Sequence, residues 1–371
     1  MTPGQLALRS LIVGFIITFA VITGFAYTTL LERKLLARLQ GRIGPNRAGY
    51  IPVPTRSGKP RRFLGGIMQP AADAVKLFFK EDITPAKVDR WVYTLAPMLA
   101  VIPAILILAV IPWAGEITIL GQTFSPYFAI APGVNVGIVF VLAITSIGVY
   151  GVVLAGWASN SKYAVLGGIR ASAQMISYEL ALGLTVLVPI MLADSMDLGE
   201  IVAAQKGVID WFVFRQPLAA IIFWIGALAE LQRAPFDLLE AEQELSAGYT
   251  VEYAGMRFGM FFMAEYMKMI ALSAITATLF FGGYRGPFVD QVPALGFLYI
   301  GLKTFIGLCI MIWIRATLPR FRYDQLMAFG WKRMLPISVL NFVVVGIFIV
   351  LQEEGILQPL FENTLRFLGI G

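Results

Sequence analysis

The feature that most constrains this chain is a run of 21 residues, Leu11 to Leu31, without a charged side chain. At about 1.5 Å per residue a helix of this length reaches about 31 Å, enough to cross the hydrocarbon core of a bilayer. The run is too long for the core of a signal peptide and has no obvious cleavage site, so we expect it to stay as an anchor. Only 14% of the chain is charged, against about 25% in soluble proteins, which argues strongly against a soluble enzyme.

Seven further apolar stretches follow, and the span near 254–281 is the least clean because Arg257, Glu265 and Lys268 interrupt it. The sequence therefore predicts an all-α polytopic membrane protein with about eight transmembrane helices in a single integral membrane domain over residues 1–371. The expected long cytoplasmic loops are 32–95 and 230–253. The expected spans are roughly 11–31, 96–114, 134–157, 175–193, 212–229, 254–281, 294–314 and 335–351.

The basic residues predict the orientation of these spans. Of 29 Lys and Arg residues, 22 lie on the odd-numbered connections or at the start of the sixth span, five lie on the other side, and Lys268 and Lys303 lie within spans. Basic loops are retained in the cytoplasm, so we expect both termini on the outer side, as an even number of spans requires. The net charge of +6 is thus interpreted as a topology signal, not as evidence for nucleic acid.

The first long loop contains an amphipathic helical pattern. The second span comes after it in the chain. A helix with this pattern lies at the headgroup boundary or packs against neighbouring spans, and the sequence does not separate the two. Before it, Tyr50 to Arg62 is expected to be an extended basic loop that contacts lipid phosphates or an acidic protein surface. The apolar face of the helix consists of Ile67, Ala71, Ala74, Val75 and Phe78, and the opposite face of Gln69, Asp73, Lys76 and Lys80.

Several cofactor classes are excluded by residue counts. The chain has no histidine, so it has no imidazole-based haem, copper or non-haem iron site. The single cysteine, Cys309, cannot hold an iron–sulfur cluster, a zinc finger or an internal disulfide. We therefore expect no metal site and no redox centre in this chain, so that electrons for any redox chemistry come from a partner.

Acidic residues gather around the fifth and sixth spans. Carboxylates in loops are usually solvated, and this is the simpler interpretation for Glu242 and Glu244. Solvation does not explain Glu179, Glu230 and Glu265, because apolar runs flank each of them. An intramembrane carboxylate is costly and marks a functional candidate. Burial and mutual repulsion favour proton uptake, so the pattern indicates a proton- or ion-handling membrane protein. Seven of the 23 acidic residues lie between 230 and 265: Glu230, Asp237, Glu240, Glu242, Glu244, Glu252 and Glu265.

Ten short segments, individually weak and together highly specific, follow one another over roughly residues 20 to 335. They are Glu32-Arg33-Lys34, Arg42-Ile43-Gly44-Pro45-Asn46-Arg47, Gln69-Pro70-Ala71-Ala72-Asp73, Phe79-Lys80-Glu81-Asp82, Gly156-Trp157-Ala158-Ser159-Asn160-Ser161-Lys162-Tyr163, Ser177-Tyr178-Glu179, Arg233-Ala234-Pro235-Phe236-Asp237, Glu242-Gln243-Glu244-Leu245, Ala264-Glu265-Tyr266 and Arg322-Tyr323-Asp324-Gln325-Leu326. In these segments the chain resembles the membrane subunit of respiratory complex I, the proton-pumping NADH-quinone oxidoreductase, that adjoins the quinone site.

The resemblance implies a function without cofactors or catalytic residues in this chain. Such a subunit walls a narrow quinone channel in the bacterial inner membrane, while FMN and iron–sulfur clusters reside in partner subunits. Iron–sulfur subunits of the peripheral arm dock on the cytoplasmic loops, and small membrane subunits and antiporter-like subunits adjoin it in the membrane. NADH is the implied electron donor, bound by other subunits.

The resemblance also assigns residues. Arg233 is implied to be the nearest counter-charge of a carboxylate chain that relays protons away from the quinone. The channel-wall positions correspond to Glu32, Arg33, Lys76 and Arg315. The proton-relay positions correspond to Glu179, Glu230, Asp237, Glu240, Glu242, Glu252 and Glu265.

The sequence departs from the family in one loop, and it leaves other functions open. Relatives pass from Gly-Pro-Asn-Arg-x-Gly to Gln-Pro through about five residues, whereas Tyr50 to Met68 here makes 19. A membrane subunit of an ion-pumping nickel–iron hydrogenase shares the span pattern and several acids. A self-contained secondary transporter predicts internal repeats, and none is visible. A purely structural anchor has no need of intramembrane carboxylates.

Overall fold

A computed structural model describes residues 3–49, 51–53, 61–63, 65–119, 122–237 and 248–354. Within these ranges, seven helical segments are long and apolar enough to cross a membrane, and a shorter apolar helix, α8 (Pro217–Glu230), joins them. The predicted all-α membrane class is confirmed. The long segments are α1 (Pro3–Leu39), α3 (Arg90–Leu106), α4 (Gly137–Ala158), α5 (Lys162–Ala193), α10 (Gly255–Phe280), α11 (Leu295–Thr317), and α12 (Tyr323–Phe329) continued by η3 (Gly330–Met334) and α13 (Leu335–Glu353).

Several helices differ in their bounds from the predicted spans. The stretch 212–229 is divided between α7 (Phe212–Arg215) and α8, because Pro217 lacks the backbone N–H that a continuing helix needs and instead begins a new helix. The stretch expected to begin at 175 begins at Lys162, because a helix continues past the membrane core wherever its charged residues reach water. For the same reason α1 runs to Leu39, so Glu32 is a helical residue and not the start of a loop.

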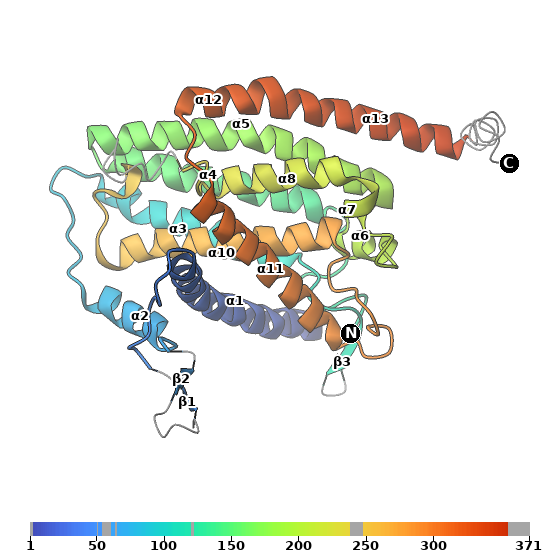
Figure 1. The fold of residues 1–371 in the computed structure, drawn as a ribbon, viewed down its shortest axis with the longest axis horizontal. Helices are drawn as coiled ribbons and strands as arrows, with labels where there is room; N and C mark the ends of the chain where they lie inside the picture. Colours follow the sequence, from blue (N-terminus) through green and yellow to red (C-terminus); the bar gives the residue numbers. More distant parts are fainter. Residues whose placement is uncertain are drawn as a thin grey trace.

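Most of the long helices lie side by side, α11 crosses them obliquely, and successive helices alternate in sense (Figure 1). One end of the bundle carries α2 (Gln69–Phe79) with strands β1 (Ile51–Val53) and β2 (Arg61–Phe63). The start of α1 and the end of α13 both point to the other end, where β3 (Ile117–Ile119), α6 (Leu198–Ala204) and α7 lie. This alternation agrees with eight crossings of the bilayer. The remaining short elements are β4 (Gln122–Phe124), η1 (Ile107–Ala109) and η2 (Gly248–Thr250).

Helix α10 lies at the centre of the bundle. In its most apolar window 72% of the residues are buried, compared with 22% in the windows of α1 and of the α12–α13 segment. Glycines let the other helices approach closely, as is common in membranes. A Cβ atom at Gly151 of α4 would lie 2.8 Å from the Ala100 backbone nitrogen of α3, and one at Gly156 would lie 2.6 Å from the Ala164 carbonyl oxygen of α5.

The loop expected to be extended and basic contains a strand pair. Strands β1 and β2 are antiparallel, with Ile51 opposite Phe63 and Val53 opposite Arg61. The turn between them, 54–60, lies outside the described residues. A second short hairpin pairs β3 with β4. These strands have three residues each, so they extend the loops without changing the helical class.

Helix α2 is confirmed, and it packs against α1 and α10. Its predicted apolar face stays open, with Val75 56% and Phe78 69% exposed. Part of the predicted polar face turns inward instead, because the Asp73 carboxylate accepts a hydrogen bond from Arg33 Nη1 on α1 at 2.8 Å. An apolar face left uncovered favours the headgroup-boundary interpretation over burial against neighbouring spans.

Candidate functional site

Five side chains from four segments form an arginine cluster, which consists of Glu32, Arg233, Glu265, Tyr266 and Arg315. Arg233 Nη1 donates to both oxygens of Glu32, at 2.9 and 3.2 Å, and Arg233 Nε pairs with Glu265. Arg315 pairs with Glu32, and the Tyr266 hydroxyl donates to Glu32 Oε2 at 2.5 Å. The Arg233 guanidinium also lies over the Tyr266 ring, 4.4 Å from its centroid. Glu32 and Arg233 are buried, and each is compensated by opposite charge.

The break after α8 positions Arg233. The helix ends at Glu230, and Pro235 prevents its continuation. Gln174 of α5, fully buried, secures the break, because its Nε2 donates to the carbonyls of Ala229 and Phe236, both at 2.9 Å. Phe236 N donates to Arg233 O at 2.8 Å and closes the turn. The interruption at Pro235 is thus the feature that brings Arg233 back toward α1 and α10.

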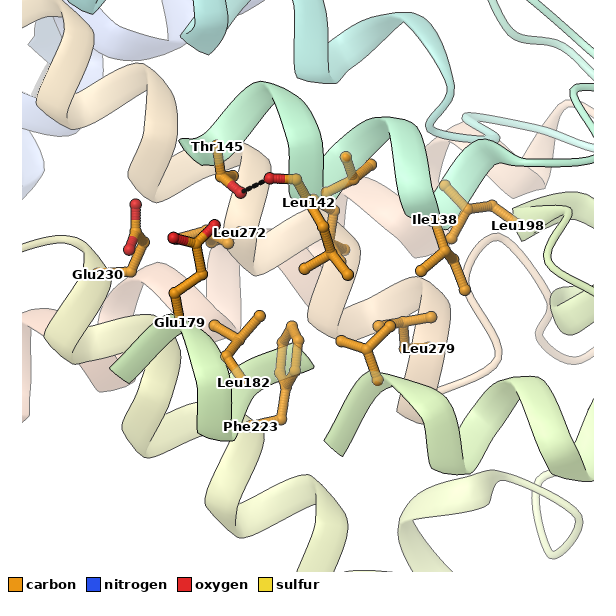
Figure 2. Close-up of a pocket in the computed structure, with 13 residues that line it drawn as sticks. Ile138, Leu142, Thr145, Glu179, Leu182, Leu198, Phe223, Glu230, Leu272 and Leu279 are labelled. Atoms are coloured by element: carbon orange, nitrogen blue, oxygen red, sulfur yellow. Dashed lines mark hydrogen bonds between the residues drawn. The ribbon is translucent and has the colours of Figure 1, made fainter. Parts of the chain in front are cut away.

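A second group, the carboxylate pocket, is formed by Glu179, Glu230, Ser146, Thr145 and Lys268. Figure 2 shows the Glu179 and Glu230 carboxyl groups at the same end of a small cavity, with Thr145 beside them and leucines and isoleucines at the other end. Ser146 Oγ donates to Glu179 Oε1. Glu230 is 5% exposed, and its Oε1 has no hydrogen-bond partner among the residues that the structure describes. This carboxyl group is therefore far less compensated than that of Glu32.

The cation nearest to Glu230 is Lys268 of α10. Its Nζ lies 3.9 Å from Glu230 Oε1, longer than a hydrogen bond. Arg233 was expected to be the nearest counter-charge of the relay carboxylates. It pairs with Glu265, whereas Lys268 is the cation near Glu230, because the turn after α8 carries Arg233 toward α1. Lys268 was missed as a site residue. The cost of a lone cation in an apolar span, the argument that selected Glu265, selects Lys268 equally.

Small cavities lie beside the residues of both groups. One of about 20 Å³ is lined by Glu179 and Glu230, and one of about 40 Å³ is lined by Glu230, Glu265 and Lys268. A third, of about 10 Å³, adjoins Glu32, Arg233 and Arg315. The two larger ones exceed the roughly 10–15 Å³ that one water molecule requires. Glu230 is common to the first two, and the Arg233–Glu265 ion pair joins the second to the third.

A larger, mainly apolar cavity of about 230 Å³ lies between α1, α2 and α10. Arg33 and Lys76 line it, together with the Asp73 partner of Arg33. The four predicted channel-wall residues are thus divided, since Glu32 and Arg315 belong to the buried arginine cluster and the other two face this cavity.

The remaining predicted relay residues lie elsewhere. Asp237 and Glu252 line none of these cavities, although the Glu252 carbonyl oxygen accepts from the Tyr93 hydroxyl at 2.6 Å. Glu240 and Glu242 lie outside the described residues. Besides Lys268, sequence reasoning missed Ser146 and Tyr266. Tyr266 lies in one of the ten segments that carry the resemblance, but neither residue is charged, and each donates to a carboxylate distant in the chain.

Comparison with known proteins identifies the family. Residues 12–346 match the sequence model described as NADH dehydrogenase. The chain belongs to the NADH dehydrogenase family. It is 48% identical over 331 residues to the second H-type subunit of the NADH-quinone oxidoreductase of Geobacter sulfurreducens, a match that covers 89% of this chain and 93% of that protein. It is 48% identical to the H-type subunit of the NADH-quinone oxidoreductase of Protochlamydia amoebophila, over 88% of this chain and 93% of that protein.

The family assignment confirms the resemblance drawn from the ten segments. These NADH dehydrogenase relatives are by name subunits of an oxidoreductase complex. In this member of the family, the arginine cluster has two acids and two bases, and the carboxylate pocket has two acids and one base. The first is electrically balanced when fully ionised, whereas the second becomes balanced only when one carboxyl group binds a proton.

Proposed function

We propose that this chain is the membrane subunit of a proton-translocating NADH-quinone oxidoreductase that forms the quinone-access channel. In this proposal it is a single multi-pass domain of the bacterial inner membrane, with the start of α1 and the end of α13 on the outer side. It binds no cofactor. Iron–sulfur subunits dock on the basic cytoplasmic loops and reduce the quinone, and small and antiporter-like membrane subunits adjoin the bundle.

The observation that carries the proposal is the order of cavities across the bundle. The cavity between α1, α2 and α10 is apolar, as a quinone tail requires, and Arg33 and Lys76 face it. Glu32, next to Arg33 in α1, enters the arginine cluster. From there Glu265 and Glu230 lead to Glu179 through water-sized cavities. An arrangement of this kind links a hydrophobic substrate site to a series of proton-binding groups.

The proposed coupling is electrostatic. Charge that forms on the quinone changes the balance at Glu32 and Arg233, because unit charges at short separation interact strongly away from water. Arg233 bridges Glu32 and Glu265, so it transmits the change toward Glu230. The carboxylate pocket is electrically balanced only when one of its two carboxyl groups is protonated. It then gains or loses that proton. Ser146 orients Glu179, and Lys268 favours one ionised carboxylate over two.

The test replaces the two pocket carboxylates separately, as Glu179→Gln and Glu230→Gln, in the complex purified from native membranes. Both variants are expected to assemble normally, to reduce quinone at least about tenfold more slowly than wild type, and to lose proton pumping, since an amide cannot exchange a proton with the series. Glu200→Gln is the matched control, because Glu200 is an exposed acid of α6 that lines none of the cavities described above. Wild-type turnover and pumping in both pocket variants, at normal assembly, would overturn the proposal.

A further inference from the structure

A groove follows the first half of α1 on a side of the bundle that faces outward. Its volume is about 530 Å³, and α1 lines it from Ile12 to Val21, with Ile12 52% and Ile16 53% exposed. The opposite wall is aromatic, with Trp113, Phe128 and Phe297 among its residues. The Phe128 and Phe297 rings pack edge to face at 5.1 Å, which gives this wall a fixed shape.

The length of the groove corresponds to one leaflet. From Ile12 to Val21 α1 rises about 14 Å, at about 1.5 Å per residue. The hydrocarbon core of a bilayer is about 30 Å thick, so one acyl chain occupies about half of it. The groove therefore accommodates an acyl chain along most of its length in the leaflet next to the start of α1.

Two donors without acceptors among the described residues adjoin the groove. Arg9 lies one helical turn before Ile12, and its guanidinium is held over the Phe124 ring at 4.5 Å. Its Nη2 atom is buried without a hydrogen-bond partner, and no carboxylate among the described residues pairs with it. The indole nitrogen of Trp113, in the groove wall, is also buried and has no partner within the described ranges. Buried donors of this kind are costly unless an acceptor reaches them.

We propose that the groove binds one anionic phospholipid, with an acyl chain between Ile12 and Val21 and its phosphate on Arg9. The phosphate oxygens supply the acceptors and the negative charge that the described part of the protein lacks at this point, and the acyl chain supplies the apolar contact. The site is independent of the proposed quinone function, since it lies on the far half of α1 from Glu32 and shares no residue with the cavities described above.

The experiment uses photoactivatable lipids in the purified complex, reconstituted in nanodiscs of phosphatidylcholine. A phosphatidylglycerol probe and a phosphatidylcholine probe carry a diazirine at the same acyl carbon, and mass spectrometry locates the adducts. We expect the anionic probe to label residues 12–21 in excess over the neutral one, and Arg9→Gln to reduce that excess about fivefold, the factor for one basic residue at an anionic surface. Arg215→Gln is the matched control, because Arg215 lies at the same end of the bundle and is already paired with Asp210 at 2.6 Å.

A second pair of variants tests the groove itself. Ala20→Trp fills the groove and should abolish labelling of residues 12–21 by both probes, whereas Phe19→Trp, on an exposed neighbouring position outside the groove, should leave it unchanged. Equal labelling by the two probes in wild type, or an excess that survives Arg9→Gln, would overturn the proposal. So would cross-links from the groove to a neighbouring protein without a lipid adduct. The Arg9→Gln comparison is decisive even if the Ala20→Trp complex does not assemble.

Discussion

The arginine cluster and the carboxylate pocket lie side by side in one bundle but differ in how closely their buried charges are paired. In the first, Glu32 accepts from two arginines and a tyrosine, so almost every buried charge has a close partner. In the second, Glu230 is equally buried, and its nearest cation is 3.9 Å away. The comparison shows that two equally buried carboxyl groups in one bundle differ in how closely opposite charge surrounds them.

The difference has a physical basis. Removing one partner of a well-paired buried cluster breaks several close contacts at once and leaves buried polar groups without partners. A carboxyl group with weak compensation escapes that cost by binding a proton. Substitutions in the arginine cluster should therefore act first on stability and assembly, whereas substitutions in the carboxylate pocket should act first on turnover.

The largest effect is expected from Arg233→Met. It removes the bridge between Glu32 and Glu265 and with it the ion pair that Arg233 makes to each of them. Breaking a buried pair costs about 3–5 kcal/mol, so we expect little assembled complex, measured by native gel and by the yield of purified complex. Arg233→Lys should recover only part of the yield, because a single ammonium cannot hold both carboxylates in the geometry of a guanidinium. Normal yield from Arg233→Met would show that the cluster does not support assembly.

Lys268→Met should give the reverse pattern. The pocket then holds two carboxyl groups and no cation, and it can restore neutrality by holding a second proton. Assembly should stay near wild type, while quinone reduction falls about a hundredfold, corresponding to about 2.7 kcal/mol on the activation barrier. The measurement is turnover per assembled complex. If Lys268→Met instead loses assembly as Arg233→Met does, the distinction between the two groups is wrong.

Tyr266→Phe tests the weakest member of the arginine cluster. It removes the hydroxyl that donates to Glu32 and keeps the ring on which Arg233 lies. The loss of a hydrogen bond to a charged group costs about 1.5 kcal/mol, and the complex should show a lower thermal midpoint with turnover reduced less than in Lys268→Met. Tyr299→Phe is a suitable control, because that exposed hydroxyl donates to the Pro287 carbonyl outside the cluster. Equal decreases of the thermal midpoint in the two variants would mean that the hydrogen bond to Glu32 stabilises the complex no more than the exposed one does.

The sequence predicts the membrane class and most spans because charge-free runs have few alternatives in a bilayer. It also identifies Glu179, Glu230 and Glu265 as intramembrane acids from their apolar flanks. It does not predict which residues pair with one another. Glu32 and Arg233 are 201 residues apart in the chain, and only the close packing of α1 with α10 and the turn after α8 brings them together. Local spacing carries no information about such a contact.

The predicted spans and the observed helices also differ in their bounds. A hydropathy run marks where a chain crosses the membrane core, whereas a helix begins and ends where its backbone hydrogen bonds do. Lys162 and Arg170 lie in α5 because the helix extends beyond that core. The division of the fifth span was visible in advance, since Pro217 lies inside the predicted run 212–229.

The smallest effect is expected from Gly148→Ala, which moves Lys268 without changing any charge. A Cβ atom at Gly148 would lie 2.5 Å from Lys268 Nζ and 3.1 Å from its Cε, so the ammonium must shift. Because the end of a lysine side chain is flexible, assembly should be unaffected and turnover should fall only about threefold, equivalent to about 0.65 kcal/mol on the barrier. Gly183→Ala is the matched control in a helix interior, since nothing among the described residues lies within 4 Å of its added Cβ and the change should be neutral or slightly stabilising. Identical turnover in the two variants would mean that the position of Lys268 is unimportant, and that only its charge contributes to the pocket.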